Sequence, residues 1–117
     1  MTGIVQDQTQ QSGSRTIQVE IYADVICPWC YIGKRRLDLA FAQRPEIRPA
    51  YVWRAFLLNP TMPLTGMDRT AYLSAKFGNS AAAVYGRIAA AGLDSGIDYR
   101  YDSITRTPDS RLAHRML

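Results

Sequence analysis

Two cysteines separated by two residues are the part of this chain that is best suited to chemistry. They form the run Cys27-Pro28-Trp29-Cys30, and the sequence has no other cysteine. A pair of thiols at this spacing can open and close a disulfide, because the second thiol lies within reach of a mixed disulfide formed on the first. The same pair can also supply half of a zinc site, or pack as two small core residues.

The residues around the pair predict that it lies where a strand meets a helix. Residues 17–26 begin with alternating apolar and polar side chains, which is the period-two pattern of a strand. Pro28 suits the first helical position, because its backbone angle is already helical and its missing N–H would have no partner there. Cys27 is then the expected N-cap of a helix that runs until Arg44-Pro45.

A helix N-terminus supplies what a reactive cysteine needs. The thiolate, not the thiol, attacks a disulfide. Free N–H groups and about half a positive elementary charge at the helix end stabilise that thiolate. We therefore expect Cys27 to be the acidic, exposed thiol, with a pKa below the free value of about 8.5. Cys30, one turn inside the helix, is expected to be the protected thiol.

The rest of the chain predicts a second strand and then a mainly helical segment. Residues 47–56 carry aromatic side chains suited to a strand, and Pro49 favours a sheet edge. A strand, a helix and a second strand of these lengths form a parallel βαβ unit. Beyond a turn-rich connection, helices are expected over residues 69–77 and 81–91, each followed by a glycine, and from residue 107 onward.

Composition limits the classes of protein. The chain has 117 residues, of which 47% are hydrophobic and 21% charged, as in one globular domain or part of one. No run approaches the roughly 18 apolar residues of a membrane span. Residues 1–15 are expected to be a flexible tail and lack the features of a signal peptide. We therefore expect a cytoplasmic protein with no membrane partner. The net charge of +4 is spread along the chain, which does not favour nucleic acid.

The sequence resembles the DsbA-family thioredoxin-like oxidoreductases, in particular their FrnE-like branch. The matching runs are VEIYADVICPWCYIGKRRLDLA, VWRAFLLNP, GMDRTAYLSAKFG and PDSRLAHRML, and they cover about residues 17–117. The resemblance implies a thiol-disulfide oxidoreductase that acts on a protein or low-molecular-weight disulfide. Cys27 would be the attacking thiol and Cys30 the resolving thiol, with Pro28 and Trp29 tuning the pair. No cofactor or metal is implied.

The resemblance also implies a fold that this sequence covers in part. In the family, a helical insertion divides the thioredoxin core into a βαβ half and a ββα half. Residues 16–56 match the βαβ half, and residues 57–117 match part of the insertion. We therefore expect residues 16–117 to form the amino-terminal part of an α/β, thioredoxin-like (DsbA-like) domain, with an incomplete fold. None of the six prolines matches the family's cis-proline. An exposed sheet edge would then allow self-association.

Other functions stay open. A truncated or inactive thioredoxin-like fragment would bind peptides or small molecules without turnover. Related folds include kappa-class glutathione transferases and chromene-carboxylate isomerases, but those relatives typically carry serine where Cys27 stands. Retained thiol-disulfide exchange would separate the first of these alternatives from a working oxidoreductase. The aromatic residues that would serve such binding are Trp29, Tyr51, Trp53 and Phe56.

Some side chains near the pair have two interpretations. The basic run at residues 34–36 either raises the local electrostatic potential or forms the solvated face of the helix. Trp29 and Tyr31 either form a contact surface beside Cys27 or pack into the core. His114 is the sole histidine, so a zinc site would need ligands from a second chain. We assign His114 no role.

Overall fold

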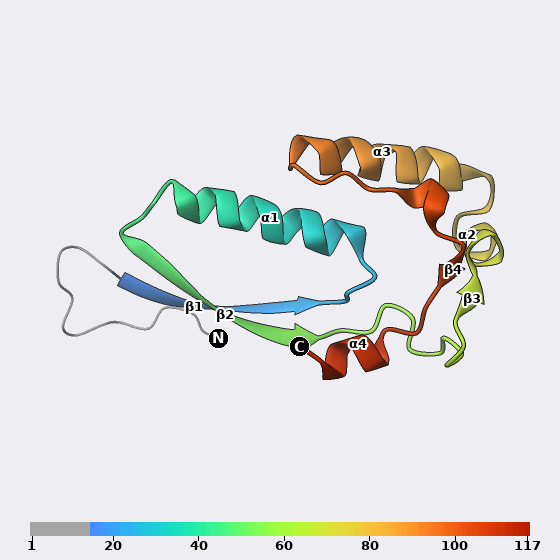
Figure 1. Cartoon of the computed structure of the whole chain (residues 1–117), viewed down its shortest axis with the longest axis horizontal. Coiled ribbons are helices and arrows are strands. Elements are labelled where there is room, and N and C mark those ends of the chain that lie inside the picture. Colours follow the sequence, from blue (N-terminus) through green and yellow to red (C-terminus); the bar gives the residue numbers. More distant parts are fainter. Residues whose placement is uncertain (1–14) are drawn as a thin grey trace.

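A two-stranded parallel sheet and one crossing helix form the first half of the chain. The computed structural model describes residues 15–117 and is shown in Figure 1. β1 (Arg15–Ala23) pairs in parallel with β2 (Ile47–Ala55), and α1 (Pro28–Ala42) connects them. The predicted βαβ unit is therefore confirmed. The expected tail lies outside the described residues, except for its last residue, which begins β1.

The second half of the chain is mainly helical and is held by a short antiparallel ladder. β3 (Met67–Asp68) pairs with β4 (Arg106–Thr107), so the ladder brings the two ends of the helical segment together. No helix in the described part of the chain is long and apolar enough to cross a membrane. The remaining elements are α2 (Arg69–Phe77), the 3-10 turn Gly78–Ser80, α3 (Ala81–Asp94), the 3-10 turn Tyr101–Ser103 and α4 (Arg111–Arg115).

Two predicted helix boundaries are wrong in this segment. α3 does not end at Gly92 but continues to Asp94. Gly92 instead permits close packing, since a Cβ atom there would lie 2.8 Å from the ring of Tyr99. The last helix begins at Arg111 and not at Thr107, because Thr107 is still paired in the β3–β4 ladder. The prediction for α2 is confirmed, including its end before a glycine.

The buried hydrophobic core lies between α1 and α3. Its centre is Ile32 on α1, Ile88 on α3 and Ile97 in the loop that follows α3. Tyr99 joins this core to the start of α1, because its hydroxyl donates a hydrogen bond of 2.6 Å to the carbonyl of Pro28. Across residues 15–117, few hydrophobic residues are buried. They are Ala23, Ile32, Met62, Ile88 and Ile97.

The basic run on α1 connects two helices. Arg35 Nη1 lies 3.2 Å from the carbonyl oxygens of both Ser95 and Gly96, and Arg36 Nε donates to Ser95 Oγ at 3.1 Å. These acceptors follow the C-terminus of α3, where the helix dipole favours a cation. Arg35 and Arg36 therefore dock α1 against α3, a role that neither interpretation of the basic run included. Lys34 does remain at the surface, paired with a neighbouring carboxylate.

Sheet edges and apolar side chains remain open to solvent. Within the described residues, β1 pairs along one edge only. Several large apolar side chains are exposed, among them Tyr22 next to this edge and Phe56 just after β2. An unpaired strand edge beside exposed apolar area favours pairing with another chain. Self-association through the edge of β1 therefore stays a prediction.

Asp24 is a buried charge at the end of β1. Its side chain is fully buried. It accepts hydrogen bonds from the backbone N–H of Leu58 at 2.9 Å and of Ile26 at 3.4 Å. His114 Nε2 on α4 lies 3.1 Å from the same carboxylate. Asp24 therefore ties the end of β1 to the segment after β2 and to the last helix. It also explains why β1 ends sooner than predicted, since Asp24 turns the chain.

The hydrogen bonds to Asp24 keep it ionised despite its burial. Burial by itself raises the pKa of Asp24, but hydrogen bonds from Leu58, Ser110, Ile26 and His114 hold it below the ordinary value of 3.8. A carboxyl group whose pKa is lowered by folding stabilises the folded state above its unfolded pKa of about 3.9. That stabilisation is lost as the pH falls through the folded value. The chain should therefore become less stable in acid.

We expect Asp24→Asn to lower the free energy of unfolding by about 3–5 kcal/mol at pH 7, because it leaves the partners of a buried anion unmatched. The deficit should shrink below about pH 4, where the carboxyl of the parent chain takes up a proton. Urea unfolding followed by circular dichroism at both pH values measures this. Asp98→Asn is the matched control, since the Asp98–Arg100 ion pair is exposed. Equal urea midpoints for Asp24→Asn and the parent chain would contradict the role of Asp24.

Candidate active site

The cysteine pair lies at the N-terminus of α1, as predicted. Cys27 is the N-cap and Pro28 the first helical residue. The N–H of Cys30 points at Cys27 Sγ over 3.3 Å. Both cysteines are half-buried free thiols. The structure therefore places two thiols one helical turn apart, with the first at the helix end.

The chain before α1 fixes where Cys27 lies. The backbone N–H of Cys27 donates to the carbonyl oxygen of Asp24 at 3.0 Å. The Asp24 side chain is itself held by three segments of the chain, as described above. The turn from β1 into α1 is therefore anchored on both its backbone and its side chain. Movement of Cys27 relative to the sheet would require breaking this buried cluster.

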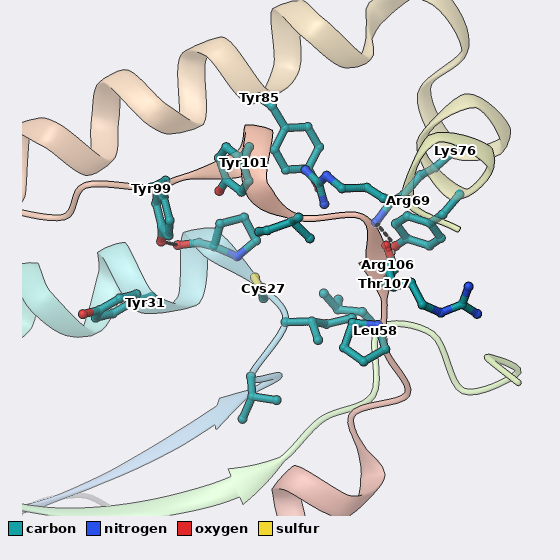
Figure 2. Close-up of a pocket in the computed structure, with 16 residues that line it drawn as sticks. Cys27, Tyr31, Leu58, Arg69, Lys76, Tyr85, Tyr99, Tyr101, Arg106 and Thr107 are labelled. Carbon is teal, nitrogen blue, oxygen red and sulfur yellow. Dashed lines mark hydrogen bonds between the residues drawn. The ribbon is translucent and has the colours of Figure 1, made fainter. Parts of the chain in front are cut away.

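A cavity of about 260 Å³ opens beside Cys27. Figure 2 shows the Cys27 sulfur at the middle of it, with Tyr99 on one side and Lys76 on the other, and the Arg69 guanidinium lies next to the rings of Tyr85 and Tyr101. The cavity lies where the start of α1 meets the helical segment. Its lining is rich in tyrosine and in positive charge. The tyrosines are Tyr31, Tyr72, Tyr85, Tyr99 and Tyr101, and the cations are Arg69, Lys76 and Arg106.

Burial beside this cavity raises the pKa of the Cys27 thiol to about 11. The adjacent side chain of Cys30 raises the pKa further, while the backbone N–H groups of Cys30 and Trp29 lower it. The expectation of an acidic Cys27 is therefore wrong for the reduced chain. The helix end does stabilise the thiolate, but desolvation of the sulfur exceeds that effect. At neutral pH Cys27 is therefore protonated.

The structure separates the aromatic residues that flank the pair from those farther away. Trp29 and Tyr31 are each 49% exposed, so they lie at the surface beside Cys27 and do not pack into the core. Tyr51, Trp53 and Phe56 belong to β2 or follow it and do not line the cavity. The four aromatic residues considered for binding are therefore not brought together at one site.

The pair Asp24–His114 is the part of the site that sequence reasoning missed. The indole N–H of Trp53 points at His114 Nδ1 over 3.4 Å. Because an indole can only donate, the hydrogen bond to Asp24 then comes from His114 Nε2. α4 thus covers Trp53 and reaches the buried carboxylate behind Cys27. An acidic residue in the apolar run ADVIC was the available signal, since such a residue is rarely left unpartnered.

His114 and the cysteines do not form a metal centre in the described part of the chain. No group of three or more His, Cys, Asp or Glu side chains that could hold a metal is found across residues 15–117. Asp24 and His114 form a pair, and the two cysteines form another. The arrangement is therefore two adjacent thiols, of which Cys27 faces the cavity.

Comparison with known proteins identifies the family of the chain. The family model for DSBA-like thioredoxin domains matches residues 18–117. A crystal structure of a probable DsbA oxidoreductase from Streptomyces coelicolor is similar, with 31% sequence identity and a TM-score of 0.69. That similarity covers 85% of this chain and 44% of the other, so the chain spans less than half the length of this relative. Comparison with the curated proteins gave no match. With a family model matching most of its length, the chain belongs to the family of DSBA-like thioredoxin domains.

Proposed function

We propose that the chain carries the redox pair of a thiol-disulfide oxidoreductase of the FrnE-like branch, with Cys27 attacking and Cys30 resolving. The observation that supports this most is the position of two free thiols one turn apart at a helix N-terminus that faces a cavity. We assign residues 16–56 to the βαβ half of the domain and 57–117 to its helical insertion. A cytoplasmic setting fits a chain whose only cysteines are this pair.

The first step forms a mixed disulfide. Cys27 loses its proton to solvent, and its thiolate attacks one sulfur of the substrate disulfide. A bond forms between Cys27 and that sulfur, the substrate S–S bond breaks, and the other half leaves as a thiolate. The N–H of Cys30, 3.3 Å from Cys27 Sγ, stabilises the attacking thiolate. Pro28 is the first helical residue, and Trp29 lies at the surface beside the pair.

The second step releases the product. Cys30 loses its proton, and its thiolate attacks the sulfur of Cys27. The Cys27–Cys30 disulfide forms, and the substrate half that was bound to Cys27 leaves as the second thiolate. The substrate disulfide has gained two electrons, and the pair has lost two. The reverse sequence donates a disulfide, so the partner's reduction potential sets the direction.

Single serine substitutions separate the two roles. We expect Cys27→Ser to abolish reaction with hydroxyethyl disulfide, because the attacking atom is lost. We expect Cys30→Ser to accumulate a mixed disulfide on Cys27, because nothing resolves it. Intact mass spectrometry under non-reducing conditions measures both, and the double serine variant is the blank. No adduct on Cys30→Ser would overturn the mechanism and favour a fragment that binds without turnover.

Alkylation tests the environment of Cys27. Because burial raises its pKa, the rate of labelling by iodoacetamide should keep rising well above the free-cysteine value of about 8.5, toward a midpoint of about 11. Cys30→Ala should lower that midpoint, because the Cys30 side chain raises the pKa whereas the backbone N–H that lowers it remains. Peptide mapping after timed labelling follows each cysteine. A midpoint below 8.5 in the parent chain would show that the helix end outweighs burial.

A further inference from the structure

We infer that the cavity beside Cys27 selects low-molecular-weight disulfides whose Cys27-bound half carries a carboxylate. This inference rests on the exchange reaction proposed for Cys27 and names its class of substrate. The mixed disulfide would place the bound half in the cavity and its carboxylate among the cations on the far wall. Figure 2 shows Arg69 and Lys76 across the cavity from Tyr99, whereas Arg106, which also lines the cavity, runs outward from that side.

The charge of the cavity is one-sided. Arg69, Lys76 and Arg106 line it, and no Asp or Glu does. None of the three forms a salt bridge with a carboxylate of residues 15–117, in contrast to Arg54, which pairs with Glu20. Three positive charges in a concave site without local neutralisation focus an attractive potential on an anion. Among the described residues, no carboxylate therefore neutralises the cations that line the cavity.

Arg69 is held by aromatic rings. Its guanidinium carbon lies 4.6 Å from the ring centroid of Tyr85 and 5.1 Å from that of Tyr101. A cation–π contact of this kind holds the guanidinium beside the rings and leaves its N–H groups able to donate to an anion. The Tyr101 hydroxyl is buried and has no hydrogen-bond partner among the described residues. Burial raises the pKa of Tyr101 and so keeps this hydroxyl protonated. This wall thus offers unused donors and no competing anion.

The other two cations are positioned by neutral groups. Lys76 Nζ donates to the hydroxyl of Tyr72 at 3.3 Å, and Arg106 Nη2 donates to the carbonyl of Thr65 at 2.9 Å. Each bond uses one donor of its cation, whereas an ammonium has three and a guanidinium five. Enough donors remain for a carboxylate, which Arg can bind in a bidentate manner.

The size of the cavity favours a small substrate. Its volume of about 260 Å³ lies just below the roughly 300–1,000 Å³ of sites that hold small molecules. That space suits one half of a small disulfide and not a folded peptide segment. Tyr99 and Pro28, joined by a hydrogen bond, form part of the wall next to the sulfur. Exchange follows the two steps above, with the carboxylate-bearing half released as its thiol when Cys30 attacks.

Three small symmetric disulfides test the charge preference on the full chain. Dithiodipropionate carries two carboxylates, hydroxyethyl disulfide is neutral, and cystamine carries two ammonium groups. We expect Cys27 to react fastest with dithiodipropionate and slowest with cystamine. Each rate is divided by the rate at which mercaptoethanol reduces the same disulfide, because this removes differences in the intrinsic reactivity of the disulfides. The advantage of dithiodipropionate should fall as salt is added. Equal normalised rates would overturn the inference while leaving the exchange function intact. Faster reaction with an acidic disulfide-bearing peptide would also overturn it.

Substitution of single cations tests which residues cause the preference for a carboxylate-bearing disulfide. Arg106→Gln and Lys76→Gln should each lower the ratio of the dithiodipropionate rate to the hydroxyethyl disulfide rate by about three- to fivefold. Arg106→Lys should retain most of it. Arg48→Gln is the matched control, because Arg48 is exposed near the start of β2 and does not line the cavity. The ratio in Arg48→Gln should equal that of the parent chain. An equal fall in all the Gln variants would show a net-charge effect and overturn the inference.

Binding of thiodipropionate separates this inference from the proposed function, because a thioether cannot exchange. We expect it to bind the reduced chain and to shift the ring signals of Tyr99 and Tyr101 in NMR spectra. Arg106→Gln should weaken the binding and Arg48→Gln should not. Binding without reaction toward any disulfide would sustain the anion site and overturn the exchange function. Reaction without Arg106-dependent binding would sustain the exchange function and overturn the anion site.

Discussion

The buried carboxylate of Asp24 is the constraint on which this structure depends. Removing a charge from water is costly, so a buried carboxylate persists only where several donors meet it. Here the donors come from the turn after β1, from the segment after β2 and from α4. Meeting that requirement brings together parts of the chain more than 50 residues apart. The same requirement fixes the turn that carries Cys27, because the backbone of Asp24 holds the N–H of Cys27.

The environment of Cys27 reflects two opposing effects. A helix N-terminus favours the thiolate, whereas burial next to a cavity lined by tyrosines favours the thiol. Burial is the larger effect, so Cys27 is protonated at neutral pH. The cavity nevertheless holds three cations that are free of carboxylate partners within the described residues. An anionic substrate would therefore bind to the cations that line the cavity while Cys27 is still a thiol. Binding of the substrate would precede formation of the thiolate.

Local patterns predicted the first half of the fold well. The alternation in the first strand, the aromatic side chains of the second and the position of Pro28 were enough to place β1, α1 and β2, and to make Cys27 the N-cap. Gly92 was misread because a glycine that permits close packing and a glycine that ends a helix look alike in sequence. The roles of Arg35 and Arg36 could not be predicted either, since their acceptors lie about 60 residues away.

The parts of the site that sequence reasoning missed all depend on long-range contacts. His114 reaches Asp24 across 90 residues, and Arg106 reaches the cavity only because the β3–β4 ladder returns the chain to the start of α2. No local pattern encodes such approaches. Burial of the Cys27 sulfur has the same origin, because Tyr99 and Tyr101 belong to the segment after α3. Sequence could therefore identify the pair of cysteines, but not the cavity that governs the pKa of Cys27.

The central claim is that Cys27 and Cys30 work as one reversible redox pair, and a redox titration tests it most directly. The chain is equilibrated with mixtures of reduced and oxidised glutathione, and the products are separated by mass after the free thiols are blocked. A reversible redox pair gives one two-electron transition between a monomeric dithiol and a monomer with an internal Cys27–Cys30 disulfide. Oxidation that yields only disulfide-linked dimers, or leaves both thiols free throughout, would contradict it.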